Sequence, residues 1–138
     1  MTPFVKTPIF AVQSIFDGWQ LDAIARPPDW GRKANSSFGE HTCKGENKAC
    51  LAAVNRFGSE LNSSLSSVLL SSTKNSGFID SCNHHCGSWA SDLTVAYMDP
   101  RVGGVDVAET FDQWYAGGDT RAWRQRERFP CDSCCHGN

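Results

Sequence analysis

Apolar residues recur with two different periods along the chain, and the stretches between them are rich in glycine, proline and asparagine. Residues 9–13 form a short apolar run near two prolines, which is typical of a buried strand of a parallel sheet. Residues 54–68 carry apolar side chains at three- and four-residue intervals, which predicts an amphipathic helix with its serines and Glu60 facing water. Gly58 and the many serines weaken this helix, because both are poor helix formers.

A second strand and a second helix follow in the same order. Residues 78–82 read as a short strand, and a loop with two adjacent histidines comes after it. Residues 105–115 repeat apolar side chains at helical spacing, and the pair Gly117-Gly118 ends this helix. Alternating strands and helices require crossover connections. The sequence therefore predicts an α/β fold with a mainly parallel sheet and flanking helices.

The polar segments carry cysteines and arginines. Residues 26–50 are predicted to be a long surface excursion, in which Cys43 and Cys50 form a local disulfide. The tail from residue 131 onward is cysteine-rich and is expected to be irregular. Arginines near the end alternate with acidic residues, which predicts the solvated face of a helix. These arginines are Arg121, Arg124, Arg126 and Arg128.

Length and composition exclude several classes of protein. The 138 residues are enough for one domain, or form a piece of a larger one. A hydrophobic content of 40% with 20% charged residues argues against disorder for most of the chain. The net charge of −2 gives no sign of nucleic-acid binding, and no apolar stretch is long enough to span a membrane.

Seven cysteines are typical of a chain that folds in an oxidising compartment and forms disulfides. Two glycosylation sequons, at Asn35 and Asn62, agree with an extracellular chain. The odd number of cysteines predicts a free thiol or a partner outside the chain. The segment that follows Met1 lacks the regions of a signal peptide, so we expect a part of a longer secreted protein.

Chemistry-bearing side chains follow both predicted strands. Functional residues of parallel sheets lie at the carboxyl ends of strands, where Asp17 and His85 both fall. They also match the last two members of the α/β-hydrolase order nucleophile, acid, histidine. The chain has no Gly-x-Ser-x-Gly elbow, so the serine is expected upstream. On this pattern alone the pair stays open, since an aspartate after a strand is commonly a cap.

Four segments resemble the plant-type pectin acetylesterases, a family of the Notum-like superfamily of α/β-hydrolases. Residues 8–20 are similar to its acid-bearing strand and loop, where the aspartate and a small residue precede Trp-Gln. Residues 77–86, Gly-Phe-Ile-Asp-Ser-Cys-Asn-His-His-Cys, resemble its histidine segment, where two variable residues separate Ser-Cys from the catalytic histidine. Residues 111–115 and the cysteine-rich end are also similar. The resemblance covers nearly the whole chain.

The resemblance implies that residues 1–138 are the C-terminal part of a single α/β-hydrolase domain, with the nucleophile in a preceding part. It implies a serine-type carboxylic ester hydrolase that removes acetyl groups from pectin, with Asp17 as the acid and His85 as the base. His84 then has no catalytic role. The implied enzyme uses no metal or cofactor, acts on acetylated pectin in the cell wall after secretion, and is monomeric, without nucleic-acid or membrane partners. The chain alone is expected to be inactive and to fold poorly.

Alternatives to this assignment stay open. A non-catalytic, disulfide-stapled module that binds polysaccharide is one. A Notum-like carboxylesterase acting on a lipidated protein is another, although Cys86 favours the pectin-directed branch. Asp80 is expected to cap a turn rather than to act as the acid. The compressed tail leaves its disulfide connectivity open, and Gly18, in place of the commoner serine, is expected only to loosen the turn.

Metal binding and sugar stacking are two further roles for which the sequence offers candidate residues. The cysteines and histidines of the histidine segment and tail have the ligand types of zinc, but their spacing fits no common structural zinc site, so disulfides are expected. The candidate zinc ligands are Cys82, His84, His85, Cys86, Cys131 and Cys134. Trp19, Trp30 and Trp89 are candidates for stacking on sugars, with packing in the core or at its rim as the default.

Overall fold

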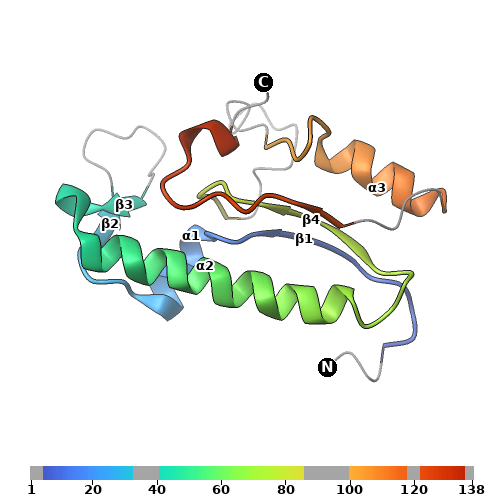
Figure 1. Cartoon of the computed structure of the whole chain (residues 1–138), viewed down its shortest axis with the longest axis horizontal. Coiled ribbons are helices and arrows are strands. Elements are labelled where there is room, and N and C mark those ends of the chain that lie inside the picture. Colours follow the sequence, from blue (N-terminus) through green and yellow to red (C-terminus); the bar gives the residue numbers. More distant parts are fainter. Residues whose placement is uncertain (1–4, 33–40, 86–99, 118–121, 136–138) are drawn as a thin grey trace.

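The computed structural model describes residues 5–32, 41–85, 100–117 and 122–135. At its centre is a sheet of three parallel strands in the order β1 (Phe10–Ser14), β4 (Ser76–Asp80) and β5 (Ala122–Arg124) (Figure 1). Ser14 lies opposite Asp80 in the register, so β1 and β4 end at the same edge of the sheet. The predicted α/β class with a mainly parallel sheet is confirmed.

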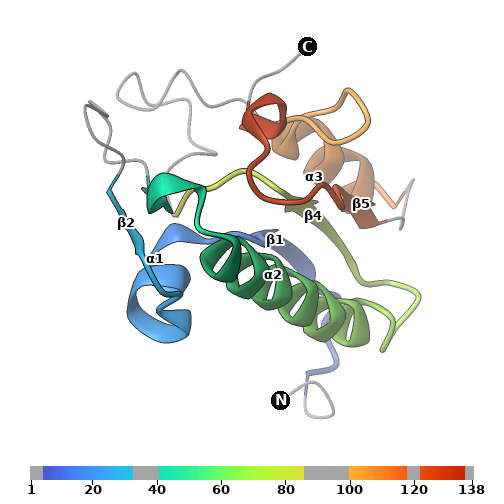
Figure 2. The same ribbon diagram turned by 60° about the vertical axis from the view of Figure 1, so that its left-hand side comes forward.

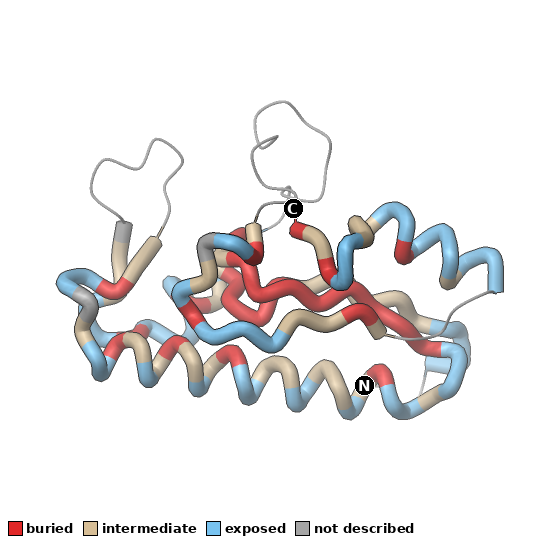
Figure 3. Tube along the Cα trace, turned by 45° about the horizontal axis from the view of Figure 1, so that its top comes forward, coloured by how far each residue is buried: buried red, intermediate tan, exposed pale blue. Residues whose placement is uncertain are grey.

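Helices cover both faces of this sheet. α2 (Lys48–Leu69) runs along one face, and α3 (Val107–Tyr115) lies on the other (Figures 1 and 2). Successive side chains of a strand point to opposite faces. Ile79 therefore joins the apolar cluster beneath α2, and Phe78 joins the cluster beside α3. All five residues of β4 are buried, and Figure 3 shows burial concentrated in the central strands.

α2 is longer than its apolar spacing predicts. It begins well before residues 54–68, because the Asn47 side chain caps it by accepting two N–H groups of the first turn at 2.8 and 3.3 Å. Gly58 lies on the buried face, where a Cβ atom would come within 2.4 Å of Cε1 of Phe16. The glycine that weakens the helix on sequence grounds is therefore what lets Phe16 pack against it.

The prediction of a solvated helix face for the terminal arginines is wrong. Ala122–Arg124 form β5, which pairs in parallel with β4, and Trp123 packs in the core beside α3. Nη1 of Arg124 donates to Oγ of Ser66 on α2 at 2.6 Å, so this guanidinium is tied to a helix rather than fully solvated. The next two arginines of the run are exposed, and Arg121 lies outside the described residues. A three-residue strand with one large apolar residue, Trp123, is too short to show an alternating pattern of apolar and polar residues.

The polar excursion after α1 (Gly18–Gln20) is partly regular. β2 (Trp30–Arg32) and β3 (His41–Cys43) form an antiparallel pair, and the predicted disulfide between Cys43 and Cys50 is confirmed. The Asn35 sequon lies outside the described residues.

Two further disulfides settle the connectivity of the tail: Cys82–Cys135 and Cys131–Cys134. Three of the four candidate zinc-binding cysteines, Cys82, Cys131 and Cys134, are therefore in disulfides and have no thiolate for a metal. The fourth, Cys86, lies outside the described residues. The tail is also less irregular than expected, since Asp132–Cys135 form a short 3-10 helix. Within the described part of the chain, no helix has the length and apolarity needed to cross a membrane.

Candidate functional site

Asp17 stands at the turn where the chain leaves β1 and enters α1. Its Oδ1 accepts the N–H of Gln20 at 2.8 Å, so it caps this short helix, the role that the sequence left open beside the catalytic one. Its Oδ2 accepts from Nε2 of Gln13 at 3.4 Å. The side chain is only 6% exposed. The cap engages one carboxylate oxygen and leaves the other available for a further donor.

That further donor is His85, from the loop after β4. Nδ1 of His85 lies 2.8 Å from Oδ2 of Asp17, and 46% of the histidine side chain is exposed. The structure therefore brings the two predicted site residues together from neighbouring parallel strands. Because β1 and β4 end at the same edge of the sheet, the loops that follow them meet there.

This contact has the geometry of an oriented general base. A carboxylate that accepts Nδ1–H fixes the neutral imidazole in the tautomer whose Nε2 carries the lone pair. The same carboxylate stabilises the ring after Nε2 has taken a proton. A half-exposed ring on a buried acid can meet a nucleophile or substrate from outside the described residues while keeping its orientation.

Two further hydrogen bonds fasten the acid-bearing loop to the histidine-bearing loop. The N–H of Gly18 donates to the carbonyl of His84 at 3.0 Å. The hydroxyl of Ser14, the last residue of β1, donates to the carbonyl of Cys82. The Asp17–His85 contact therefore rests on backbone contacts, as well as on the side chains themselves.

Trp19 lies beside the pair. Its ring stacks on His85 with 5.9 Å between centroids and 25° between planes, and it is 55% exposed. Trp30 differs, because its Nε1 donates to Asp22 at 2.6 Å and its ring packs against Phe129. Trp30 thus follows the packing default, whereas Trp19 presents an aromatic surface next to the histidine; Trp89 lies outside the described residues.

A second histidine–aspartate pair, which sequence reasoning missed, lies beneath the first. Oδ1 of Asp80 accepts the N–H of Cys82 at 3.0 Å, so the predicted turn-capping role is confirmed. Both carboxylate oxygens also lie 3.0 Å from Nε2 of His84, and the two side chains are 0% and 1% exposed. The signal available in the sequence was a histidine four residues after a strand-end aspartate.

The environment of His84 shifts its proton affinity. Burial, the largest single effect, lowers the pKa of His84, whereas the hydrogen bond and the negative charge of Asp80 raise it. The carbonyl of His85 and the charge of Asp17 act in the same direction, so the pKa lies above its ordinary value of 6.5. Among the described residues, no group of three or more histidine, cysteine and acidic side chains is placed to hold a metal ion.

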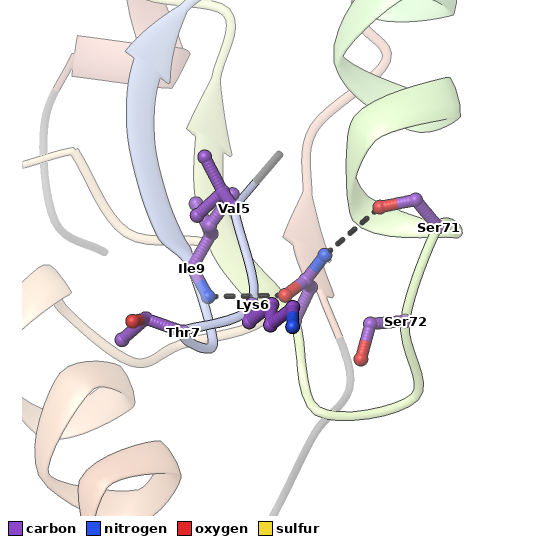
Figure 4. A pocket seen from close by; sticks show the side chains of 7 residues that line it. Val5, Lys6, Thr7, Ile9, Ser71 and Ser72 are labelled. Carbon is purple, nitrogen blue, oxygen red and sulfur yellow. Dashed lines mark hydrogen bonds between the residues drawn. The ribbon is translucent and has the colours of Figure 1, made fainter. Parts of the chain in front are cut away.

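Two cavities lie away from this site. One, of about 440 Å³, lies at the amino end of β1, beside the end of α2 (Figure 4). In its wall, the Asn75 side chain donates to Oγ of Ser71 at 3.2 Å and accepts the N–H of Ile9 at 3.0 Å. The other, of about 590 Å³, lies between α2 and residues 126–128. Neither is lined by Asp17 or His85, so neither is the centre of the predicted chemistry.

Fold and site together define an α/β protein with a histidine–aspartate pair at the carboxyl ends of its parallel strands. Comparison with known proteins narrows this class. The family model described as Pectinacetylesterase matches residues 1–136, and the chain belongs to this family.

Two curated relatives come from Arabidopsis thaliana. The chain is 30% identical to pectin acetylesterase 7 over 97% of its own length and 33% of that protein. It is 28% identical to pectin acetylesterase 11 over 80% of its own length and 28% of that protein. The matches fall in the C-terminal part of both, so the chain spans about a third of the length of these relatives. No solved structure matches the chain significantly.

Proposed function

We propose that this chain supplies the acid and the base of a pectin acetylesterase, a serine-type carboxylic ester hydrolase that releases acetate from cell-wall pectin. The single observation that carries the proposal is the 2.8 Å contact between Nδ1 of His85 and Oδ2 of Asp17. Family membership supports the ester-hydrolase class, and the names of the two relatives support acetylated pectin as the substrate. The serine belongs to a part of the enzyme outside this chain.

The first half of the proposed reaction forms an acetyl-enzyme. Nε2 of His85 takes the proton of the serine hydroxyl as the serine oxygen attacks the acetyl carbonyl, while Asp17 stabilises the imidazolium. Backbone N–H groups outside this chain stabilise the oxyanion. When the intermediate collapses, the bond between the acetyl carbon and the sugar oxygen breaks, and the sugar hydroxyl leaves with the proton from Nε2.

The second half repeats these steps with water. Nε2 of His85 takes a proton from the water molecule as its oxygen attacks the acetyl-serine. Collapse of this intermediate breaks the bond to the serine oxygen, which takes the proton from Nε2, and releases acetic acid, which ionises to acetate in water. Asp17 keeps Nδ1–H engaged throughout, so His85 alternates between base and acid without changing its orientation. The exposed ring of Trp19 is placed to contact the sugar that carries the acetyl group.

The proposal includes a secreted, monomeric cell-wall enzyme. Three disulfides among the described residues are typical of an oxidising compartment. The Asn62 sequon lies on α2, where Asn62 itself is half-buried with its Oδ1 covered, and its neighbours Ser63 and Ser64 are exposed. β1 pairs on only one side within the described residues, so its other edge offers backbone groups to which further strands of a larger sheet can pair.

A chimera tests this function. In it, the chain replaces the matching segment of pectin acetylesterase 7 from Arabidopsis thaliana, and acetate release from acetylated pectin is measured. We expect activity in the chimera, and a loss in kcat/KM of about 10⁴-fold with Asp17→Asn and about 10⁶-fold with His85→Ala, because each removes a member of the triad. The 138-residue chain alone should release no acetate.

His41→Gln is the matched control, since His41 also pairs with an aspartate, at 3.2 Å from Asp22, away from the Asp17–His85 contact. It should leave acetate release unchanged. Acetate release that survives His85→Ala would rule out the proposed base. A chimera that binds pectin without hydrolysing it would favour the non-catalytic module.

A further inference from the structure

The buried pair beneath the proposed site has no role in the mechanism above. We propose that His84 is a positioning residue: its imidazolium, paired with Asp80, fixes the backbone of His85 and thereby aims the base at Asp17. This inference rests on the proposed function for its catalytic consequence. Its structural part stands on the contacts of His84 alone.

The contacts of the His84 ring define its protonation state. Nε2 faces both oxygens of the Asp80 carboxylate at 3.0 Å, and Nδ1 faces the carbonyl oxygen of His85 at 3.2 Å. Carboxylate and carbonyl oxygens only accept hydrogen bonds, whereas a neutral imidazole has a single N–H. Only the imidazolium donates to both partners at once. The raised pKa of His84 agrees with this geometry.

Burial makes the pair rigid. The side chains of His84 and Asp80 are 1% and 0% exposed, and Asp80 is the last residue of the central strand β4. A buried ion pair in good geometry is costly to break from one side, because the remaining charge is left without its partner. The Asp80 carboxylate also accepts the N–H of Cys82, which ties it to the backbone of the same loop.

His84 connects the two halves of the proposed site. Its side chain donates to the carbonyl of His85, and its own carbonyl accepts the N–H of Gly18, which directly follows Asp17. The charged groups that face it are Asp80, from its own strand end, and Asp17, from the neighbouring loop. His84 therefore fixes the position of the His85 backbone relative to the loop that carries Asp17.

Nuclear magnetic resonance of the chimera, with its histidines isotope-labelled, tests the structural part without any substitution in residues 1–138. We expect both ring nitrogens of His84 to be protonated at neutral pH, and the His84 ring to titrate above the ordinary histidine pKa of 6.5. Asp80→Asn should convert His84 to a single-proton tautomer at the same pH. A single-proton tautomer of His84 in the unaltered chain would overturn the proposal.

Kinetics of the chimera test the catalytic part. His84→Gln keeps a hydrogen-bonding side chain but removes the charge, so kcat should fall about tenfold with KM unchanged, against about 10⁶-fold for His85→Ala. The resonance of the His85 Nδ1 proton should broaden in the same variant, since the contact with Asp17 loosens. An unchanged kcat together with an unchanged His85 resonance would overturn the positioning role.

Failure of the proposed function gives a different result. An inactive chimera with the unaltered chain would contradict the esterase proposal, and the magnetic resonance measurement would still decide the state of His84. His41→Gln serves again as the control histidine and should alter neither kcat nor the His85 resonance.

Discussion

Two adjacent histidines occupy opposite environments at the end of β4. The His84 side chain is 1% exposed and bonds to Asp80 at the end of β4, whereas that of His85 is 46% exposed and bonds to Asp17 in the loop after the neighbouring strand β1. A half-exposed base can exchange protons with a substrate. A buried imidazole between two acceptors instead keeps its protons and serves as a fixed contact.

The stability of the chain should therefore depend on pH through His84. Its folded-state pKa lies above the ordinary value of 6.5, so its pairing contributes fully below about pH 6.5 and is lost as the pH rises through the folded pKa. We expect the free energy of unfolding of the chimera, measured by urea denaturation, to decline over that window. His84→Gln should flatten the decline. An equal slope in the unaltered chain and His84→Gln would contradict the prediction.

At the level of elements, the sequence predicts the features that depend on the spacing of apolar residues or on the order of strands and loops along the chain. The spacing of residues 54–68 locates α2, and the order of strands and loops places Asp17 beside His85. β5 was missed because a three-residue strand carries no period, and pairing with β4 decides its state. The contact between His84 and Asp80 was missed because it depends on how the loop turns back over the strand end.

Gly58 shows how packing overrides helix propensity. Gly58→Ala gains about 1 kcal/mol of helix propensity, but its Cβ would lie 2.4 Å from Cε1 of Phe16, which is only 2% exposed. Overpacking of this kind costs about 1–3 kcal/mol, so we expect a net loss of about 1 kcal/mol in the free energy of unfolding. Urea denaturation measures it.

Phe16 identifies the cause of that loss. In a Phe16→Leu background the ring is gone, and adding the methyl group at Gly58 should no longer destabilise the chain. Ser59→Ala, at an exposed position of the same helix, should be neutral or slightly stabilising. Equal losses with and without the Phe16 ring would show that the clash is not responsible.

At the scale of the whole molecule, the loop after β1 and the C-terminal segment meet at the site. β1 and its loop supply Asp17, and the C-terminal segment returns so that Phe129 packs with Phe16 and Cys135 bonds to Cys82. Cys82 lies between Asp80 and His84, the pair proposed to position the base. The far end of the chain therefore fastens the loop on which that pair depends.

This fastening predicts unequal roles for two disulfides. Cys82–Cys135 joins residues 53 positions apart, and Cys43–Cys50 joins residues 7 apart. A crosslink stabilises by restricting the unfolded chain, and the restriction grows with the loop that it closes. Loop entropy gives about 4 kcal/mol for the long loop and about 2 kcal/mol for the short one. Urea denaturation should therefore show a larger loss in the free energy of unfolding for the double variant Cys82→Ser, Cys135→Ser than for Cys43→Ser, Cys50→Ser. Equal losses would show that native contacts of the tail, rather than the length of the closed loop, dominate its stabilising effect.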